Sequence, residues 1–265
     1  MLKTLKKYLR LWLSFFKASF IADLEYRANF IMRLATDIFW YIAQVMVFEA
    51  LYDHTDKIGS WTLPQTRVFL GVLFIADGLY MIFFHDNLEK MNERARKGEL
   101  DLLLAKPVNS QFMLSTQRVG TVLLGNLCVG TGYFIWALAH YDDFSAARLL
   151  WLLLLIPTGL LCHYTMRFMI AATTLIFTRA DNLQYIWYQI YRLGLRPDSI
   201  YSPWLKFVIL TVLPVGLIAS VPSRAVLGEP NVALYLYTII LAAALLYGSH
   251  RFWNYCLSRY TSASS

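Results

Sequence analysis

Long apolar runs alternate with short polar segments along most of this chain. Such runs cover about residues 30–52, 68–84, 112–139, 149–177 and 232–253. A helix that crosses a bilayer needs roughly 20 predominantly apolar residues, so each run has a suitable length. The pattern therefore predicts five membrane-spanning helices before the less regular segment between residues 183 and 228 is considered.

That less regular segment leaves two alternatives for a further span. In the first, residues 183–200 form the fifth span, and 203–228, with Pro214, Gly216 and Pro222, forms a re-entrant hairpin on the external side. Such a broken backbone is tolerated at membrane depth only where protein covers it. In the second, residues 183–202 lie on the inner surface and 204–221 form the fifth span. Both alternatives give six spans.

The first residues follow a different pattern, in which apolar side chains recur at helical spacing. Basic residues lie mostly on the rest of the helical wheel, which predicts an amphipathic helix in the membrane interface over residues 1–29. A secretory signal peptide is the weaker alternative, because Lys17, Asp23 and Glu25 interrupt the apolar run. The apolar positions are Leu2, Leu5, Leu9, Trp12, Leu13, Phe16 and Phe20.

Composition agrees with an integral membrane protein. Hydrophobic residues make up 58% of the 265-residue chain, charged residues only 15%, and the mean hydropathy is +0.47. Soluble domains carry roughly 25% charged residues. Six spans leave too little polar chain for a separate soluble domain, so we expect an all-α membrane protein that forms one domain over residues 1–265.

The distribution of positive charge predicts the orientation. Lys and Arg gather in the leader and around residues 90–106, whereas residues 53–65 and 140–145 contain few of them. Cytoplasmic flanks are rich in Lys and Arg, so the leader and the 90–106 region are expected in the cytoplasm, together with both termini. The net charge of +7 then indicates contact with anionic lipid rather than with nucleic acid.

A compact charged loop follows the second span. Residues 85–97 continue it as a polar helical stalk, and 98–111 complete a cytoplasmic segment that begins at 85. Gly98 is a natural helix stop. Leu100 and Leu104 lie one helical turn apart, next to the charged Glu99 and Asp101, so a short helix here could insert an apolar anchor into a partner. An ordinary polar turn is the alternative.

Several ionisable residues fall inside the predicted spans, where an unpaired charge is costly. Asp77 lies in the middle of the second span, and His163 and Arg167 lie four residues apart in the fourth. We expect an ion pair between Asp77 and Arg167, because burial requires a partner first. A proton relay is the alternative.

Small residues recur on one side of the third span, at Thr121, Gly125, Cys128 and Gly132. Such a stripe allows a second helix to approach closely, so we expect a packing surface for a helix of this chain or of a partner. The three cysteines show no metal-ligand or disulfide spacing.

The chain also lacks the motifs of the common hydrolases. No G-x-x-x-x-G-K-[ST], H-E-x-x-H or G-x-S-x-G sequence occurs, so no catalytic residue, metal site or bound cofactor is predicted. If ATP drives this protein, another polypeptide must bind it.

The sequence from Gly98 to Asn109, GELDLLLAKPVN, resembles the cytoplasmic loop of the permeases of ABC-2-type exporters, above all the branch whose permeases act in pairs. The segment RPDSIYSPWL at 196–205 is similar to the family's stretch before its external hairpin, and LPV at 213–215 with VPS at 221–223 is similar to the hairpin. The likeness, which covers nearly the whole chain, implies a six-span exporter permease fold in a prokaryotic cytoplasmic membrane.

The resemblance also implies partners. The loop would dock on a separate ATPase that carries the ATP and Mg²⁺, and a second permease, identical or homologous, would complete the translocation path. Two other classes stay open from the residues alone: an intramembrane enzyme acting on lipid, with His163 or an aspartate as base, and a membrane anchor that recruits a cytoplasmic protein. The implied docking residues are Gly98, Glu99, Leu100, Asp101, Leu104, Lys106 and Pro107.

Overall fold

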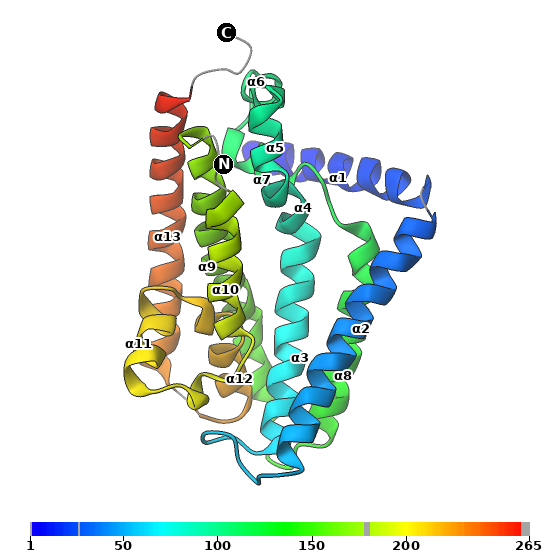
Figure 1. Cartoon of the computed structure of the whole chain (residues 1–265), viewed down its shortest axis with the longest axis vertical. Helices are drawn as coiled ribbons and strands as arrows, with labels where there is room; N and C mark the ends of the chain where they lie inside the picture. Colours follow the sequence, from blue (N-terminus) through cyan, green and yellow to red (C-terminus); the bar gives the residue numbers. More distant parts are fainter. Residues whose placement is uncertain (1, 26, 178–180, 230, 261–265) are drawn as a thin grey trace.

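The computed structural model describes residues 2–25, 27–177, 181–229 and 231–260. In these ranges the chain is a bundle of helices without named strands (Figure 1). The major helices are α1 (Leu2–Glu25), α2 (Arg27–Tyr52), α3 (Leu63–Tyr80), α4 (Asp86–Glu89), α5 (Met91–Arg96), α6 (Glu99–Leu104), α7 (Ser110–Thr116), α8 (Leu124–Ala139), α9 (Leu149–Ala172), α10 (Asp181–Gly194), α11 (Pro203–Thr211), α12 (Ser220–Val226) and α13 (Val232–Arg259).

Five helical stretches of the described chain are long and apolar enough to cross a membrane: Phe30–Tyr52, Leu63–Arg96, Thr121–Ala139, Ala146–Leu175 and Val232–Arg259. A sixth candidate is the pair formed by Pro203–Thr211 and Val215–Val226, which bends by 79°. The predicted all-α fold with several membrane spans is confirmed. Residues 178–180, which follow the fourth predicted span, lie outside the described residues, as do residues 261–265.

The helix α3 forms the centre of the bundle. Its residues Val68–Phe74 are buried on all sides, between α2, α8, α9 and α12. The approach to α8 is close, because a Cβ on Gly71 would lie 2.7 Å from the Cα of Phe134, and one on Gly130 would lie 2.9 Å from the Cβ of Phe74. Glycines therefore set the distance between these two helices.

The predicted stalk is a helical continuation of the second span. The π-helical turn Met81–His85 joins α3 to α4, and α5 follows, as the predicted stalk requires. Gly98 then adopts a left-handed conformation with φ +70°, which ends α5 and begins α6. At the other end of α3, Gln65 Oε1 accepts from the Thr62 N–H at 2.9 Å and so caps the helix.

The third span is shorter than predicted, since it begins at Thr121 and not at Phe112. Residues 117–120 interrupt the helix between α7 and the short 3₁₀ turn Thr121–Leu123. The side chain of Asn87 replaces the missing helical bonds: it donates to the Arg118 carbonyl at 2.7 Å and accepts from the Arg118 N–H at 2.9 Å. A buried amide on the stalk thus stabilises the break.

Neither alternative for residues 183–221 describes the structure fully. The helix α10 has 14 residues, about 21 Å, which is too short for a complete span. It runs alongside α9 (Figure 1) and does not lie across the end of the bundle, contrary to the second alternative. The 79° bend also means that residues 204–221 are not one straight helix. The re-entrant hairpin at 203–228 stays a prediction.

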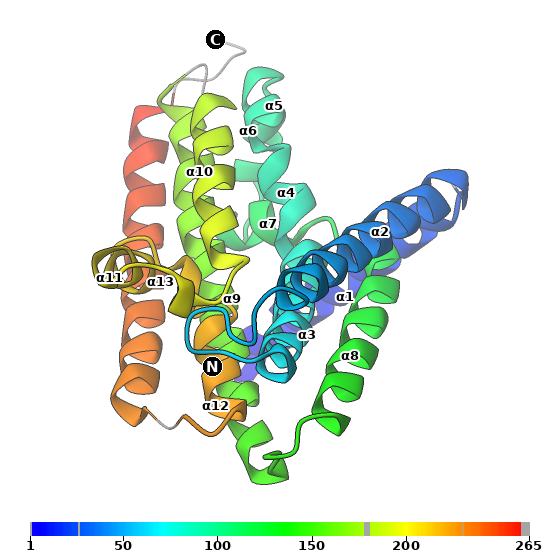
Figure 2. The ribbon, with the colours of Figure 1, turned by 60° about the horizontal axis from the view of Figure 1, so that its bottom comes forward.

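Two further features complete the arrangement. The helix α1 crosses the end of the bundle that carries α6 (Figure 1), as expected for an interfacial helix. At the opposite end, the connection between α2 and α3 lies near α11 and α12 (Figure 2). There Gly59 has φ +65°, and a Cβ on it would lie 2.5 Å from the Ser199 carbonyl oxygen, so only glycine fits.

Candidate functional site

The tip of the stalk, residues 98–109, contains the predicted short helix α6. The leucines that it exposes differ from those predicted. Leu100 is 0% exposed and packs with Leu88 and Met91 of the stalk, and Leu104 is partly buried against the same cluster. Leu102, in contrast, is 73% exposed. The prediction that Leu100 and Leu104 form the anchor for a partner is therefore wrong, because they hold α6 against its own bundle.

The exposed surface of the tip is small and mixed in chemistry. Leu102 projects among charged and polar groups, and Glu93 on the adjacent α5 forms an ion pair with Lys97. This carboxylate raises the pKa of Lys97 above its ordinary value. Of the other predicted docking residues, Gly98 and Asp101 are partly buried. Glu99, Lys106 and Pro107 are exposed, and so are Leu102 and Ala105, which were not among the predicted docking residues.

The amphipathic helix α1 contacts this tip directly. Lys7 Nζ donates to the Pro107 carbonyl at 3.1 Å, and the Asn109 N–H donates to the Tyr8 hydroxyl at 3.1 Å. The Tyr8 ring packs edge-to-face on Phe112, with centroids 4.8 Å apart. Sequence reasoning missed these contacts, since nothing in the two segments, 100 residues apart, indicates that they meet.

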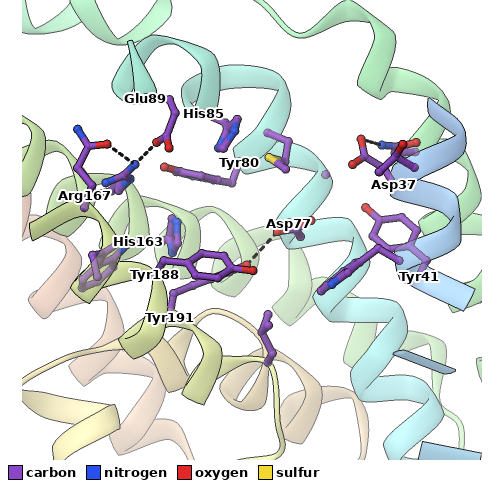
Figure 3. Close-up of a pocket in the computed structure, with 18 of the residues that line it drawn as sticks. Asp37, Tyr41, Asp77, Tyr80, His85, Glu89, His163, Arg167, Tyr188 and Tyr191 are labelled. Atoms are coloured by element: carbon purple, nitrogen blue, oxygen red, sulfur yellow. Dashed lines mark hydrogen bonds and ion pairs between the residues drawn. The ribbon is translucent and has the colours of Figure 1, made fainter. Parts of the chain in front are cut away.

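A cavity of about 600 Å³ lies between α2, α3, α9 and α10 (Figure 3). It contains all three of the predicted intramembrane polar residues, Asp77, His163 and Arg167. Aromatic side chains form much of its wall. The rings of Tyr80 and Tyr191 both pack edge-to-face with the His163 ring, with centroid distances of 4.0 Å and 4.6 Å. The sequence thus identified cavity residues but not the aromatic wall around them.

The predicted ion pair between Asp77 and Arg167 is wrong. Asp77 accepts a hydrogen bond from the Tyr191 hydroxyl at 2.9 Å, whereas Arg167 forms an ion pair with Glu89 and a weaker contact with Gln184 at 3.4 Å. Figure 3 shows Arg167 and Glu89 together on one side of the cavity, away from Asp77. The stalk continues α3 as a helix and so brings Glu89 to Arg167.

The opposite side of the cavity carries a second carboxylate. Asp37 of α2 accepts from the Asn126 amide of α8 at 2.7 Å. In Figure 3, Asp37 lies beside Tyr41, on the far side of Asp77 from Arg167. The cavity therefore has a side with an arginine and a histidine and a side with two aspartates.

The predicted small-residue stripe is not one packing surface of this chain. Thr121 donates to Asp23 of α1, and a Cβ on Gly125 would lie 2.8 Å from Leu34 of α2. Cys128 is exposed, and a Cβ on Gly132 would have no neighbour within 4 Å. The close contact of α8 with α3 uses Gly130 instead.

Among the described residues, no group of three or more His, Cys, Asp or Glu side chains is arranged to hold a metal ion.

The long apolar helices of the described chain define a multi-pass membrane protein, with a cavity between its helices. A family model described as "ABC-2 family transporter protein" matches residues 38–264. The chain therefore belongs to the ABC-2 transporter family and is a permease component of an ABC transporter. Comparisons with curated proteins and with solved structures gave no significant match.

Proposed function

We propose that this permease is one half of a permease pair in an export system and that a separate cytoplasmic ATPase drives it through the tip at residues 98–109. The ATPase would bind ATP and Mg²⁺, and the permease would change its opening mechanically. The exposed Leu102 carries this proposal, since an unpartnered leucine at the end of a rigid stalk suits a protein contact.

The attachment of the tip supports a mechanical role. Leu100 fixes α6 to the stalk, and α1 contacts Pro107 and Asn109. Because the stalk is continuous with α3, a force on α6 would reach the helix that forms one wall of the cavity. A tip joined to the bundle by packed side chains can transmit a movement, whereas a loose loop cannot.

The proposed location is the cytoplasmic membrane of a prokaryote, with both termini in the cytoplasm. The helix α1, the tip and the end of α13 lie at one end of the bundle (Figure 1), which supports a common side for them. Exposed cations on α1 and at the tip agree with a cytoplasmic side. The cavity between α2, α3, α9 and α10 would face the pathway that a second permease completes.

The test replaces Leu102 by Asp in the tagged full-length permease. Affinity purification in mild detergent from the native host should recover an ATPase with a Walker motif, and Leu102→Asp should reduce its recovery about ten- to a hundredfold. This is the loss expected when burial of one leucine, about 1.5–3 kcal/mol, is removed. Mass spectrometry identifies the partner and any second permease.

Leu102→Met is the matched control, since it keeps an apolar side chain of similar size and should keep the ATPase. Size-exclusion chromatography of each variant establishes that the fold is intact. Recovery of the ATPase at the same level with Leu102→Asp would contradict docking through α6. A preparation without any ATPase would contradict the proposed coupling as a whole.

A further inference from the structure

Three buried nitrogen atoms at one side of the cavity have no hydrogen-bond partner among the described residues. They are Arg167 Nη1, His163 Nδ1 and Gln184 Nε2. Arg167 and His163 are only 7% and 4% exposed, and all three residues line the cavity. Arg167 Nη1 and Gln184 Nε2 are donors, and His163 Nδ1 donates in one tautomer of the ring. A buried donor without an acceptor is costly, and these three nitrogens come from two helices to one place. This side of the cavity, which we call the donor side, therefore suits an acceptor oxygen.

The other side of the cavity, the acceptor side, has the opposite chemistry. Neither Asp77 nor Asp37 has an ion-pair partner within the described chain, and each accepts one hydrogen bond there. The amide oxygen of Asn126, which is 3% exposed, has no donor. Carboxylate and amide oxygens accept hydrogen bonds, so the acceptor side suits a ligand group with N–H or O–H donors.

Charge excludes a simple anion as the ligand. Glu89 already balances Arg167 on the donor side, and the two aspartates add negative charge to the same cavity. An anion without a compensating donor group would meet repulsion from all three carboxylates. A ligand that carries an acceptor at one end and an amino or hydroxyl donor at the other satisfies both sides.

The walls between the two sides are aromatic. Tyr80, Trp187 and Tyr188 line the cavity near the donor side, and Trp40 and Tyr41 line it near Asp37. Aromatic walls favour a flat, apolar body through stacked and edge-to-face contacts. At about 600 Å³ the cavity has the size of sites for small organic molecules.

We propose that the cavity binds a bipolar small molecule with a flat, apolar body: Arg167, His163 and Gln184 hold an acceptor group of this molecule, and Asp77 and Asp37 hold a donor group. The proposal rests on the proposed function, because it names the class of substrate that the exporter would carry. It assigns the two polar ends of the substrate to separate sets of side chains.

Three related dyes test the two ends separately. The unsubstituted rhodamine carries amino groups on a flat ring system and a free carboxylate, and its methyl ester lacks the carboxylate. Fluorescein keeps the carboxylate but, measured at pH 8, has deprotonated ring oxygens in place of the amino donors. Fluorescence anisotropy with the purified full-length permease gives each affinity. We expect the unsubstituted rhodamine to bind at least about tenfold more tightly than either relative, since each relative loses one charged or donor contact.

Variants assign each preference to its side of the cavity. Gln184→Leu should bring the carboxylate-to-ester affinity ratio toward one, and Arg167→Lys, which keeps a cation for Glu89, should do the same. Asp77→Asn should reduce the preference for rhodamine over fluorescein and leave the ester ratio unchanged. Arg192→Gln, an exposed change on α10 outside the cavity, is the matched control and should alter neither ratio.

Equal affinities of the three dyes would overturn the proposal, because apolar partition alone would then explain the binding. The same holds if no dye binds saturably, or if the cavity variants leave both ratios unchanged. If Arg167→Lys does not fold, Gln184→Leu gives the same test and keeps both members of the ion pair, with loss only of the 3.4 Å contact between Gln184 and Arg167. These measurements use the permease alone, so their failure leaves the ATPase contact of Leu102 standing, and loss of that contact leaves the dye ratios standing.

Discussion

Two aspartates in this permease have opposite surroundings. Asp198, 1% exposed, lies where the chain leaves α10 and meets α12, and its carboxylate pairs with Arg224 at 2.6 Å and with Lys206 at 3.3 Å. Asp77 faces the cavity with only the Tyr191 hydroxyl as a described partner. The comparison indicates that matched charges hold the fold together, whereas unmatched ones are kept for a ligand.

The largest expected effect comes from breaking the matched pair. Arg224→Met should lower the free energy of unfolding by about 3–5 kcal/mol, because it leaves the buried Asp198 carboxylate with the partly exposed Lys206 as its remaining ion-pair partner. The change also removes two other interactions of Arg224. These are its ion pair with Glu229 and its cation–π contact with Trp61, whose ring centroid lies 5.5 Å from Arg224 Cζ. Thermal unfolding in detergent measures the loss, and a melting temperature equal to that of the wild type would contradict a structural role for this cluster.

The membrane spans could be predicted from the sequence because bilayer thickness fixes their length. The apolar runs predicted one end of each of α2, α9 and α13 and placed the other end within about six residues. The segment from α10 to α12 could not be predicted in the same way, since its short helices are stabilised by neighbours far away in sequence. Trp187, for instance, packs against Val215 and Ile218, and no local pattern indicates that contact.

The candidate site was predicted in position but not in detail. The stalk and the short helix were found from Gly98 and the charge pattern, yet a helix of six residues has too few turns for periodicity to show which leucine is buried. The Asp77 pairing failed for a similar reason. Residues in different helices can be paired from sequence only if the positions of the helices along the bundle axis are known. In the structure Arg167 pairs with Glu89 and not with Asp77.

A smaller effect should distinguish the two cations of the matched cluster. Lys206 lies farther from Asp198 than Arg224 does and is 36% exposed at its side chain. Lys206→Met should therefore lower the free energy of unfolding by no more than about 1 kcal/mol, as for partly exposed pairs. Thermal unfolding of Lys206→Met and Arg224→Met under the same conditions measures the two losses of stability. Equal losses would mean that both cations are needed to compensate Asp198.

The smallest effect on stability is expected for Asp77→Asn, although this change should have a large effect on ligand preference. The asparagine keeps an oxygen that accepts from Tyr191, and it removes a charge in the cavity that no described ion pair balances. We expect the free energy of unfolding to change by less than about 1 kcal/mol. Thermal unfolding of Asp77→Asn and Arg224→Met side by side checks the difference. A loss for Asp77→Asn as large as that for Arg224→Met would mean that the cavity carboxylate is also structural, and the distinction between the two aspartates would then fail.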